Sequence, residues 1–391
     1  MSINFSASSE TGDQIPLVSV VIPSYNQSSY IEKAINSVLS QDFVDIELLV
    51  SDDASLDNSW EIIQRIKDPR IRTFQQKRNL GPVGNLVFLI KESRGKYVAL
   101  LNSDDFWLPG KLGKQVEIME SDSKLGACFT WADLVNESGD IITGAEAIWS
   151  DVFRQPNRSQ AEWLSHFFFC GNCICHPSML VRREVYSQLG FYNPALRQLP
   201  DFEMWIRMVK HHPIYVIQET LVGHLRTGVN TSVLSAENSA RNLTELSEIF
   251  YTFFRDIPDD LFIAGFESHF RLKGVQMTSE RLHCEKLFLL LDSGFAQAAA
   301  RSAAIRSFYD SFCDPELEQI LLNEYIFSVF DYYQITGKSG FGYFCLQATN
   351  QKTLTLCACA TDFGHVWRNG LINKFAKKVI RLLRRWRFAR D

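Results

Sequence analysis

Features that are missing from this sequence exclude several classes of protein before any motif is considered. The N-terminal residues MSINFSASSETGDQIP contain no basic start followed by an apolar run, which predicts a disordered lead-in at 1–15 rather than a secretory signal. No uninterrupted apolar segment is long enough to cross a bilayer. No glycine-rich phosphate loop follows the first predicted strand, where PSYNQSSY stands instead, so a bound phosphate would not be held by a glycine cradle.

The charge and the cysteine pattern limit the partners and the compartment. A net charge of −5 gives no reason to expect attraction of the whole surface to nucleic acid, so we expect no nucleic-acid partner. Nine cysteines at irregular spacing, without a secretion signal, favour free thiols in a reducing cytoplasm. With 391 residues and 46% hydrophobic content, the chain is long enough to bury a sizeable core.

Short apolar segments alternate with segments of helical periodicity in the N-terminal part of the chain. The predicted strands are 19–22, 46–50, 71–74 and 97–101, and the predicted helices between them are 30–39, 60–66 and 83–90. This alternation is typical of βαβ units, so we expect an α/β fold with a parallel-rich sheet covered by helices on both faces. From 236 onwards, helical patterns such as 243–254 and 296–309 predict a mostly helical second part.

Polar residues follow three of the predicted strands directly, as PSYN at 23–26, SDD at 51–53 and NSDD at 102–105. Ligands bind beyond the carboxyl ends of the strands in such sheets, so these segments are expected to converge on one rim. Asp and Ser also cap helices commonly, and that alternative stays open for each segment taken alone. Convergent carboxylates suit a hard divalent cation, which takes oxygen ligands and often shares them with substrate phosphates.

Four segments, PLVSVVIPSYN, LLVSDDAS, RNLGPVGN and GKYVALLNSDD, resemble the family 2 glycosyltransferases in their order and spacing. The resemblance runs from about 16 to about 232 and continues through the segment at 171–208. It implies a GT-A fold, a Rossmann-like α/β sandwich at 16–235, in front of the mostly helical region at 236–372. The implied activity is inverting transfer of a hexosyl or N-acetylhexosaminyl group from a nucleotide diphosphate sugar, with a UDP-sugar favoured and Mn²⁺ or Mg²⁺ as cofactor. The implied acceptor is a saccharide or lipid-linked saccharide in bacterial surface polysaccharide or glycolipid synthesis.

The resemblance also assigns roles to individual residues. Asp105 is the expected metal ligand, with Asp104 closer to the ribose or the donor sugar. Asp201, in the first turn of a predicted helix, is the expected catalytic base, although an Asp there is also a common helix cap. The remaining contacts are expected from Pro23, Ser24, Tyr25, Asp52 and Arg78 on the nucleotide side, and from Asn172, His176 and Arg226 on the acceptor side. For Arg78, a solvated surface arginine is the alternative.

Three positions depart from the family pattern. Asn102 stands where many relatives have Asp, Pro200 stands where they usually have Glu, and Gly228 stands where a metal-reaching histidine is expected after Arg226. Whether His224 or another histidine completes the metal site stays open. The departures keep open a catalytically silent sugar-nucleotide-binding or scaffold module. A nucleotidyltransferase, which has a similar α/β shape, is a second alternative. The glycine-rich, lysine-containing loop usual in nucleotidyltransferases is absent, which counts against that alternative.

Two further segments carry unusual composition. Three cysteines and a histidine in CGNCICH, at 170–176, raise the possibility of a zinc site, but no second ligand pair is apparent. The segment NKFAKKVIRLLRRWRFARD predicts a basic amphipathic helix at 373–391, which suits an anionic membrane surface and would place the chain on the inner face of the plasma membrane. The sequence does not decide whether the chain forms a homo-oligomer.

Overall fold

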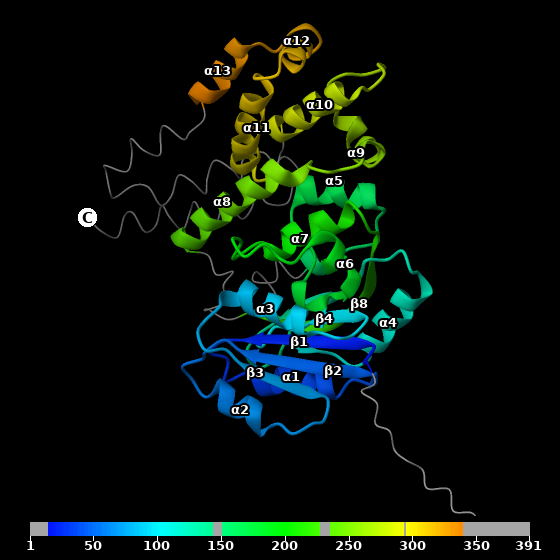
Figure 1. Cartoon of the computed structure of the whole chain (residues 1–391), viewed down its shortest axis with the longest axis vertical. Helices are drawn as coiled ribbons and strands as arrows, with labels where there is room; N and C mark the ends of the chain where they lie inside the picture. The colour runs from blue at the N-terminus through cyan, green and yellow to red at the C-terminus, as the bar shows by residue number, and fades with distance from the viewer. Residues whose placement is uncertain (1–14, 144–150, 227–234, 293–294, 339–391) are drawn as a thin grey trace, which may run out of the picture. The chain divides into compact units, whose positions relative to one another are not determined.

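The computed structural model of the protein describes residues 15–143, 151–226, 235–292 and 295–338 (Figure 1). The predicted lead-in at 1–15 lies outside these residues except for position 15, and the predicted basic helix at 373–391 lies wholly outside them. The chain divides into two units, Met1–Val233 and Leu234–Asp391. This division falls close to the predicted boundary between 235 and 236.

The N-terminal unit is built on one sheet of eight strands in the order β3-β2-β1-β4-β7-β6-β8-β5. Its first four positions are parallel neighbours, namely β3 (Ile71–Gln75), β2 (Ile46–Asp52), β1 (Val18–Ser24) and β4 (Tyr97–Leu100). These are the four strands that the sequence predicts, with ends that differ by no more than two residues. The α/β prediction is therefore confirmed.

The other half of the sheet is mixed. β7 (Leu180–Arg182) pairs antiparallel with β4 and with β6 (Ala127–Val135), and β5 (Phe106–Trp107) pairs antiparallel with β8 (Ile214–Leu225). β6 and β8 run parallel, with irregular register on both sides of Trp131. The parallel-rich prediction thus holds where βαβ units build the sheet, whereas longer connections bring in strands of both directions.

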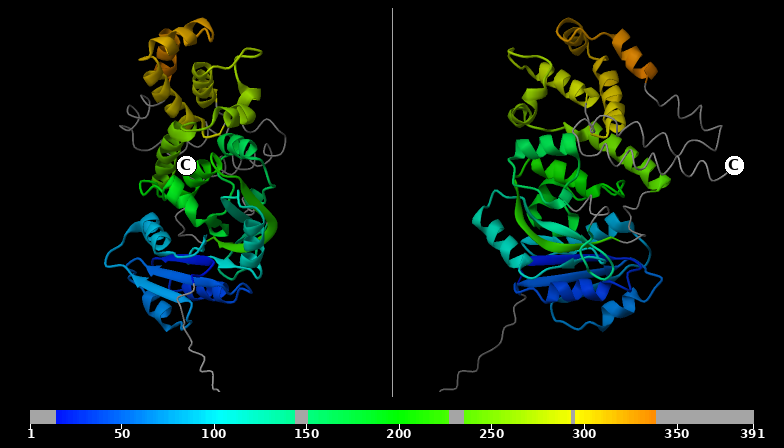
Figure 2. Two further views of the ribbon diagram at one scale, coloured as in Figure 1. Left: turned by 45° about the vertical axis from the view of Figure 1, so that its right-hand side comes forward. Right: turned by 180° about the vertical axis from the view of Figure 1, so that it is seen from behind.

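Helices cover both faces of the parallel half, as predicted. In Figure 1 and Figure 2, α1 (Ile31–Leu39) and α2 (Ser59–Arg65) lie on one face, and α3 (Gly81–Glu92) lies on the other. The chain moves outward from β1 to β3 and then returns through α3, which places β4 on the other side of β1. The strand order therefore reverses between β1 and β4, and such a switch point is where open α/β sheets bind ligands.

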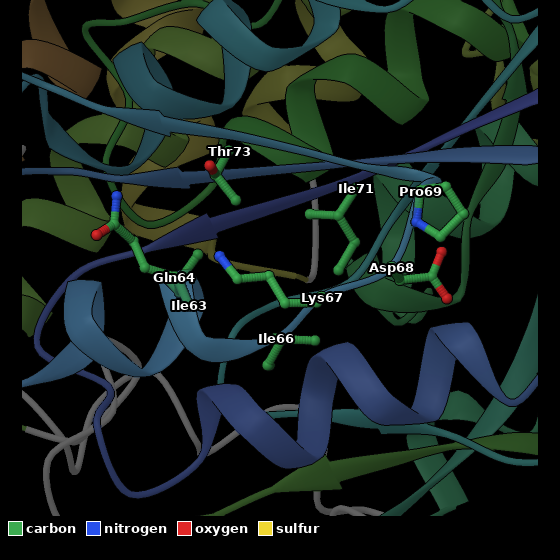
Figure 3. Close-up of a pocket in the computed structure, with 8 residues that line it drawn as sticks. All are labelled: Ile63, Gln64, Ile66, Lys67, Asp68, Pro69, Ile71 and Thr73. Atoms are coloured by element: carbon green, nitrogen blue, oxygen red, sulfur yellow. The ribbon is translucent and has the colours of Figure 1, made fainter.

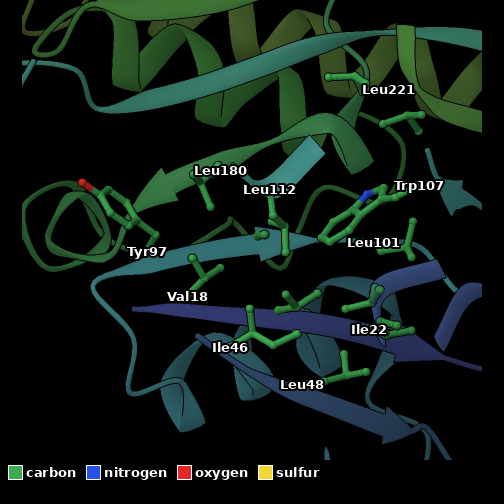
Figure 4. Close-up of a cluster of buried hydrophobic side chains, with 14 of the residues drawn as sticks. Val18, Ile22, Ile46, Leu48, Tyr97, Leu101, Trp107, Leu112, Leu180 and Leu221 are labelled. Carbon is green, nitrogen blue, oxygen red and sulfur yellow. The ribbon is translucent and has the colours of Figure 1, made fainter. Parts of the chain in front are cut away.

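The core beneath this half follows the two-residue period of the strands. Val18, Val20 and Ile22 of β1 pack with Leu48 and Val50 of β2 against α1, and all five side chains are buried (Figure 4). Ser24 and Asp52 continue the same alternation at the ends of these strands. Their side chains consequently belong to the α1 face of the sheet.

Later elements of the unit bring more residues towards the carboxyl edge. α5 (Gln160–Cys170) packs against α7 (Pro200–Val209), and α6 (Arg183–Leu189) also contacts α7. α4 (Lys111–Ser121) packs on β6, and the short helix η2 (His176–Ser178) contacts β4, β6 and β8. These contacts link residues around 175 and 201 to the sheet that carries Asp104 and Asp105.

We predict that Gly95→Ala destabilises the N-terminal unit, because β4 enters the sheet through a very close approach. A Cβ atom at Gly95 would lie 2.6 Å from the backbone nitrogen of Ser19 and 2.9 Å from the carbonyl carbon of Val18. Backbone atoms cannot move aside cheaply, so the free energy of unfolding should fall by about 1–3 kcal/mol. Urea denaturation measures it. Gly113→Ala in α4 is the control, because its Cβ would only touch Asp42 at 3.7 Å; equal stability of both variants would contradict the prediction.

The described part of the C-terminal unit contains only helices. They are α8 (Ala236–Phe253), α9 (Asp259–Phe266), η3 (Glu267–His269), α10 (Ser279–Asp292), α11 (Gln297–Ser311), α12 (Pro315–Asn323) and α13 (Val329–Lys338). α11 packs against both α8 and α10. The helical prediction is confirmed as far as 338, and 339–372 lie outside the described residues. Within the described ranges, no helix combines the length and apolar character needed to cross a membrane.

Candidate functional site

The three predicted polar segments follow strands that are neighbours in the sheet. Parallel pairing places the carboxyl ends of β1, β2 and β4 at the same edge, with Ser24 and Asp52 directly opposite each other in the register. The segment from Asn102 to Asp105 follows β4, which lies next to β1. One edge of the sheet therefore carries the side chains that the sequence predicts to meet.

Ser24 and Asp52 leave two buried polar atoms available for a ligand. Both residues are almost completely buried, at 2% and 0% exposure. Asp52 Oδ2 accepts a hydrogen bond from the backbone N–H of Ser55 at 3.1 Å, but within the described residues neither Asp52 Oδ1 nor Ser24 Oγ has a partner. A buried polar atom without a partner costs about 1–3 kcal/mol, so two of them on facing residues indicate a site for a ligand that supplies the missing hydrogen bonds.

The loops after β1 and β2 hold this pair in place. Asn26 and Ala54 both adopt left-handed backbone conformations, with φ of 54° and 60°. The N–H of Asn26 donates to Ser55 Oγ at 2.9 Å, and the N–H of Leu56 donates to Asn26 Oδ1 at 2.8 Å. The two loops are thus joined to each other, and Tyr25, the residue after Ser24, is exposed.

Asp53 contacts the segment that leads into α3 and does not cap α2, the helix that follows it in the chain. Asp53 Oδ1 accepts the N–H of Leu80 at 2.7 Å, directly before α3. Burial raises the pKa of Asp53, with the charge of Asp52 acting in the same direction and the N–H donors opposing both. Arg78 is exposed on the turn before α3, and no hydrogen bond among the described residues joins it to Asp52. Its nucleotide contact stays a prediction.

Asp105 is held by donors on three sides. Its carboxylate accepts the backbone N–H of Leu225 at 2.8 Å and the Asn102 side-chain amide at 2.9 Å, and His224 Nδ1 lies 3.0 Å from Oδ1. Asp105 is 1% exposed. A carboxylate at position 102 would face Asp105 with a like charge, whereas Asn102 supplies an N–H donor. The departure at Asn102 therefore orients the neighbouring acid.

The charges around Asp104 make it receptive to a cation. Burial and the neighbouring charge of Asp105 raise the pKa of Asp104 to about 7. Burial alone would lower the pKa of His224, but the adjacent Asp105 outweighs it and the pKa of His224 is raised. Asp104, Asp105 and His224 thus lie near one another beyond the end of β4. Among the described residues, however, no group of three or more His, Cys, Asp or Glu side chains is arranged to hold a metal by itself.

The predicted base contacts one of the predicted acceptor-side residues. Asp201 is the second residue of α7, and its Oδ2 accepts a hydrogen bond from Asn172 Nδ2 at 2.8 Å. Glu203, two residues further on, pairs instead with Arg207 at 2.8 Å. Glu203 therefore stabilises the helix.

The thiol of Cys175 is influenced by both Asp105 and Asp201. It is buried, and its pKa is raised well above the usual value, first by burial and then by the charges of these two acids. Both carboxylates are therefore close enough for their charges to act on the same thiol. His176 packs beside them, with Nε2 3.0 Å from the Tyr192 hydroxyl, and burial lowers the pKa of His176 to about 3. This position gives His176 a packing role, and its acceptor contact stays a prediction.

The cysteines and the histidine of the 170–176 cluster belong to no group of three or more metal-holding side chains among the described residues. Cys170 is exposed, while Cys173 and Cys175 are buried.

Arg226 follows β8, where its N–H donates to the carbonyl oxygen of Val135 and its charge opposes protonation of His224. Arg226 therefore lies on the side of the acid pair. Gly228 lies outside the described residues.

Sequence reasoning missed Tyr30 at this edge. Burial raises the pKa of Tyr30, and the charges of Glu137 and Asp104 raise it further. Its hydroxyl interacts with Glu137, on the turn that follows β6. Tyr30 stands directly before α1, and no local pattern signals a partner more than a hundred positions away.

A separate pocket lies at the opposite edge of the sheet. It has a volume of about 410 Å³ and lies where α2 leads into the amino end of β3 (Figure 3). Its lining residues are Ile63, Gln64, Ile66, Lys67, Asp68, Pro69, Ile71 and Thr73. Asp68 is paired with Arg70 at 2.8 Å. The pocket therefore lacks the acid pair and the unpartnered oxygens of the carboxyl edge.

Comparison with known proteins gives a consistent family. The model of the family described as Glycosyl transferase family 2 matches residues 19–189. An uncharacterized glycosyltransferase of Methanocaldococcus jannaschii is 30% identical over 212 residues, which cover 53% of this chain and 70% of that protein. The UDP-Glc:alpha-D-GlcNAc-diphosphoundecaprenol beta-1,3-glucosyltransferase WfaP of Escherichia coli is 35% identical over 193 residues, covering 49% of this chain and 70% of WfaP.

Solved structures support the same fold. Residues 1–349 of S. aureus TarS in complex with UDP-GlcNAc superpose with a TM-score of 0.53 at 15% sequence identity. The match covers 76% of this chain and 91% of the TarS chain. At this level of identity the likeness concerns the fold alone.

Proposed function

Because this chain belongs to the family 2 glycosyltransferases, we propose that it moves a sugar, with inversion, from a nucleotide diphosphate donor to an acceptor hydroxyl. The expected GT-A fold and the expected enzyme class are confirmed. The observation that carries the proposal is the unpartnered pair of Ser24 Oγ and Asp52 Oδ1 at the sheet edge that also carries Asp104 and Asp105. The silent binding module and the nucleotidyltransferase are not favoured.

We propose a UDP-sugar as the donor. Uracil presents one ring N–H between two carbonyl oxygens, so it offers one donor and two acceptors. Asp52 Oδ1 can accept from that N–H, and the Ser24 hydroxyl can donate to a neighbouring carbonyl. The name of WfaP specifies UDP-Glc, and the TarS structure contains UDP-GlcNAc, which supports the same choice for a glucosyl or N-acetylglucosaminyl group. Pro23, Tyr25 and Arg78 are proposed as the further nucleotide contacts.

We predict that Asp52→Ala weakens UDP binding by about 10- to 150-fold, because a hydrogen bond to a carboxylate contributes about 1.5–3 kcal/mol. Isothermal titration of the purified chain with UDP measures this effect. Asp45→Ala is the control, since Asp45 is exposed at the other end of β2. Equal affinity of the wild-type chain and Asp52→Ala would remove Asp52 from the nucleotide site.

We propose that Mn²⁺ or Mg²⁺ is held at Asp105, with Asp104 on the side of the ribose or the donor sugar and His224 beside the two acids. The raised pKa of Asp104 next to Asp105 fits a place where a cation replaces protons. Since the described residues offer no complete cage, the ion would take further ligands from the donor pyrophosphate. When bound, the ion neutralises charge that develops on the leaving pyrophosphate.

The protein supplies the other half of the chemistry through Asp201. A base must take the proton of the acceptor hydroxyl as that oxygen attacks the sugar, and Asp201 stands in the first turn of α7, where the helix dipole favours negative charge. Asn172 and Arg226 are proposed to line the acceptor side with it. The acceptor named for WfaP is a diphosphoundecaprenol-linked GlcNAc, and we propose a saccharide or lipid-linked saccharide of surface polysaccharide or glycolipid synthesis.

We propose that the basic segment at 373–391, which lies outside the described residues, binds an anionic membrane where a lipid-linked acceptor would be found. Each Lys or Arg near such a surface contributes about 1 kcal/mol. Truncation after Asn373 is therefore expected to abolish co-sedimentation with phosphatidylglycerol vesicles while transfer to a soluble acceptor continues. If the truncated chain bound the vesicles as strongly as the full chain, the membrane proposal would be wrong.

A further inference from the structure

The hydrogen bond between Asn172 and Asp201 joins two elements that are far apart in the chain. Asn172 lies just after α5, and Asp201 lies in the first turn of α7. α5 and α7 pack together, with the rings of Phe167 and Phe202 edge to face at 5.8 Å. Both rings are almost fully buried. The two polar residues therefore lie at the ends of two helices that pack together.

The turn after α5 directs Asn172 towards α7. Gly171, the residue at the C-cap of α5, has φ of 86° and ψ of −164°, a backbone conformation that residues with a Cβ rarely adopt. A different residue at this position would alter the exit from α5. The backbone conformation of Gly171 thus determines the position of the Asn172 Cα atom, from which the side chain extends.

The hydrogen bonds of Asn172 determine which of its amide atoms faces Asp201. Asn172 Oδ1 accepts the backbone N–H of Ile174 at 3.2 Å. Because an N–H requires an acceptor, the amide oxygen must lie on that side and the NH₂ group on the other. Nδ2 then donates to Asp201 Oδ2 at 2.8 Å. If the side-chain amide of Asn172 were rotated by 180°, its NH₂ group would face the N–H of Ile174 and its oxygen would face the carboxylate of Asp201. Neither pair could form a hydrogen bond.

Pro200, which precedes Asp201, cannot perform this task. Proline has no backbone N–H and no polar side-chain atom, although it is well suited to the first position of a helix. Leu199 before it has no side chain able to cap the helix. Asn172, from another part of the chain, donates a hydrogen bond to the Asp201 carboxylate.

We propose that Asn172 is the positioning residue of the catalytic base. By donating to Oδ2, it fixes the rotation of the Asp201 carboxylate and favours its ionised form, which is the form that accepts the acceptor proton. This inference rests on the proposed role of Asp201 in sugar transfer. It gives Asn172 a function through Asp201 in addition to its proposed place on the acceptor side.

Two substitutions at one position test the proposal. Asn172→Asp keeps an oxygen for the Ile174 N–H but replaces the donor to Asp201 with a like charge, whereas Asn172→Ala removes both bonds. We expect kcat to fall by about 10- to 100-fold in both variants, with KM for the donor changed much less, because a misplaced catalytic group costs about that factor. A purely structural role at the turn after α5 would leave Asn172→Asp active. Wild-type kcat in Asn172→Asp would therefore overturn the proposal.

A double variant in which Asn172 and Asp201 exchange residue types gives a second readout, which does not depend on turnover. Asn172→Asp should lower the thermal unfolding temperature through repulsion from Asp201, and the double variant Asn172→Asp with Asp201→Asn should recover it, since the donor and the acceptor have changed places. The double variant should remain inactive. Failure to recover the unfolding temperature would contradict direct contact between the two side chains.

The results also separate this inference from the proposed function. If the wild-type chain transferred no sugar from any nucleotide diphosphate sugar while the exchanged pair recovered stability, the proposed function would be wrong and the contact would stand without its catalytic role. If the wild-type chain were active and Asp201→Asn were inactive, but Asn172→Asp kept full kcat, the positioning role alone would be wrong.

Discussion

Replacing Asp201 with asparagine is expected to lower the turnover of sugar transfer by about 100- to 10,000-fold, which is the usual contribution of a general base. Asparagine has the same shape but cannot accept the proton. Donor binding should change little, because the nucleotide pair of Ser24 and Asp52 belongs to different strands. The measurement is initial rates of transfer from the donor, together with isothermal titration of UDP.

Glu203→Gln is the matched control for this experiment. Glu203 stands in the same first turn of α7 but pairs with Arg207, so its removal should cost at most about 1 kcal/mol of stability and leave turnover unchanged. Full turnover in Asp201→Asn would show that another group takes the proton. A similar loss in Glu203→Gln would point to damage of the helix rather than to lost base catalysis.

Replacing Asp105 with asparagine should remove the metal dependence of donor binding and lower kcat/KM by about 1,000-fold or more, since a metal supplies several kcal/mol of charge stabilisation. Asp105 is buried and held by Asn102, His224 and the Leu225 N–H, so an amide in its place also loses acceptors for these donors. Titration of a UDP-sugar with and without Mn²⁺ measures the change directly.

Asp122→Asn, at the end of α4 on the exposed surface, is the control for the loss of one carboxylate. It should keep both turnover and the response to Mn²⁺. A chain with Asp105→Asn that still bound the donor more tightly in Mn²⁺ than without it would place the metal elsewhere. Because Asp105 contacts three donors, the thermal unfolding temperature of the Asp105→Asn variant should be compared with that of the wild-type chain before its activity is interpreted.

The local part of the fold was predictable because its signals are local. The first four strands and three helices follow from apolar runs and helical spacing within a few residues of each other. β5 was not predictable, since Phe106–Trp107 forms a strand only by pairing with β8, more than a hundred positions away. The same holds for the antiparallel pairing of β7 with β4 and β6.

The residues of the candidate site were likewise predictable from local sequence, whereas the contacts between them were not. Polar residues after apolar strands pointed to Ser24, Asp52 and the acid pair, whose common edge follows from parallel pairing. The contacts that orient these groups join distant residues, and no spacing rule reports them. Asn102 looked like a lost charge in the sequence, but in the structure it donates to Asp105.

The sequence left open which histidine stands beside the acids. The family pattern expects a metal-reaching histidine at the position of Gly228, which lies outside the described residues, whereas the structure sets His224 Nδ1 at 3.0 Å from Asp105 Oδ1. Gly223 allows this close arrangement, because a Cβ there would lie 2.4 Å from the Phe106 ring. Only the pairing of β5 with β8 reveals that His224 stands next to the acid pair.

The most direct test of the central claim is an isothermal titration of the purified full chain with UDP-Glc and UDP-GlcNAc, with Mn²⁺ and again with EDTA. We predict that at least one of the two donors binds at least about tenfold more tightly in Mn²⁺ than in EDTA. We also predict that the Asp52→Ala substitution weakens the binding of that donor in both conditions. Binding of neither donor, or affinity that is the same in Mn²⁺ and EDTA and unchanged by Asp52→Ala, would contradict a metal-assisted UDP-sugar site at this edge of the sheet.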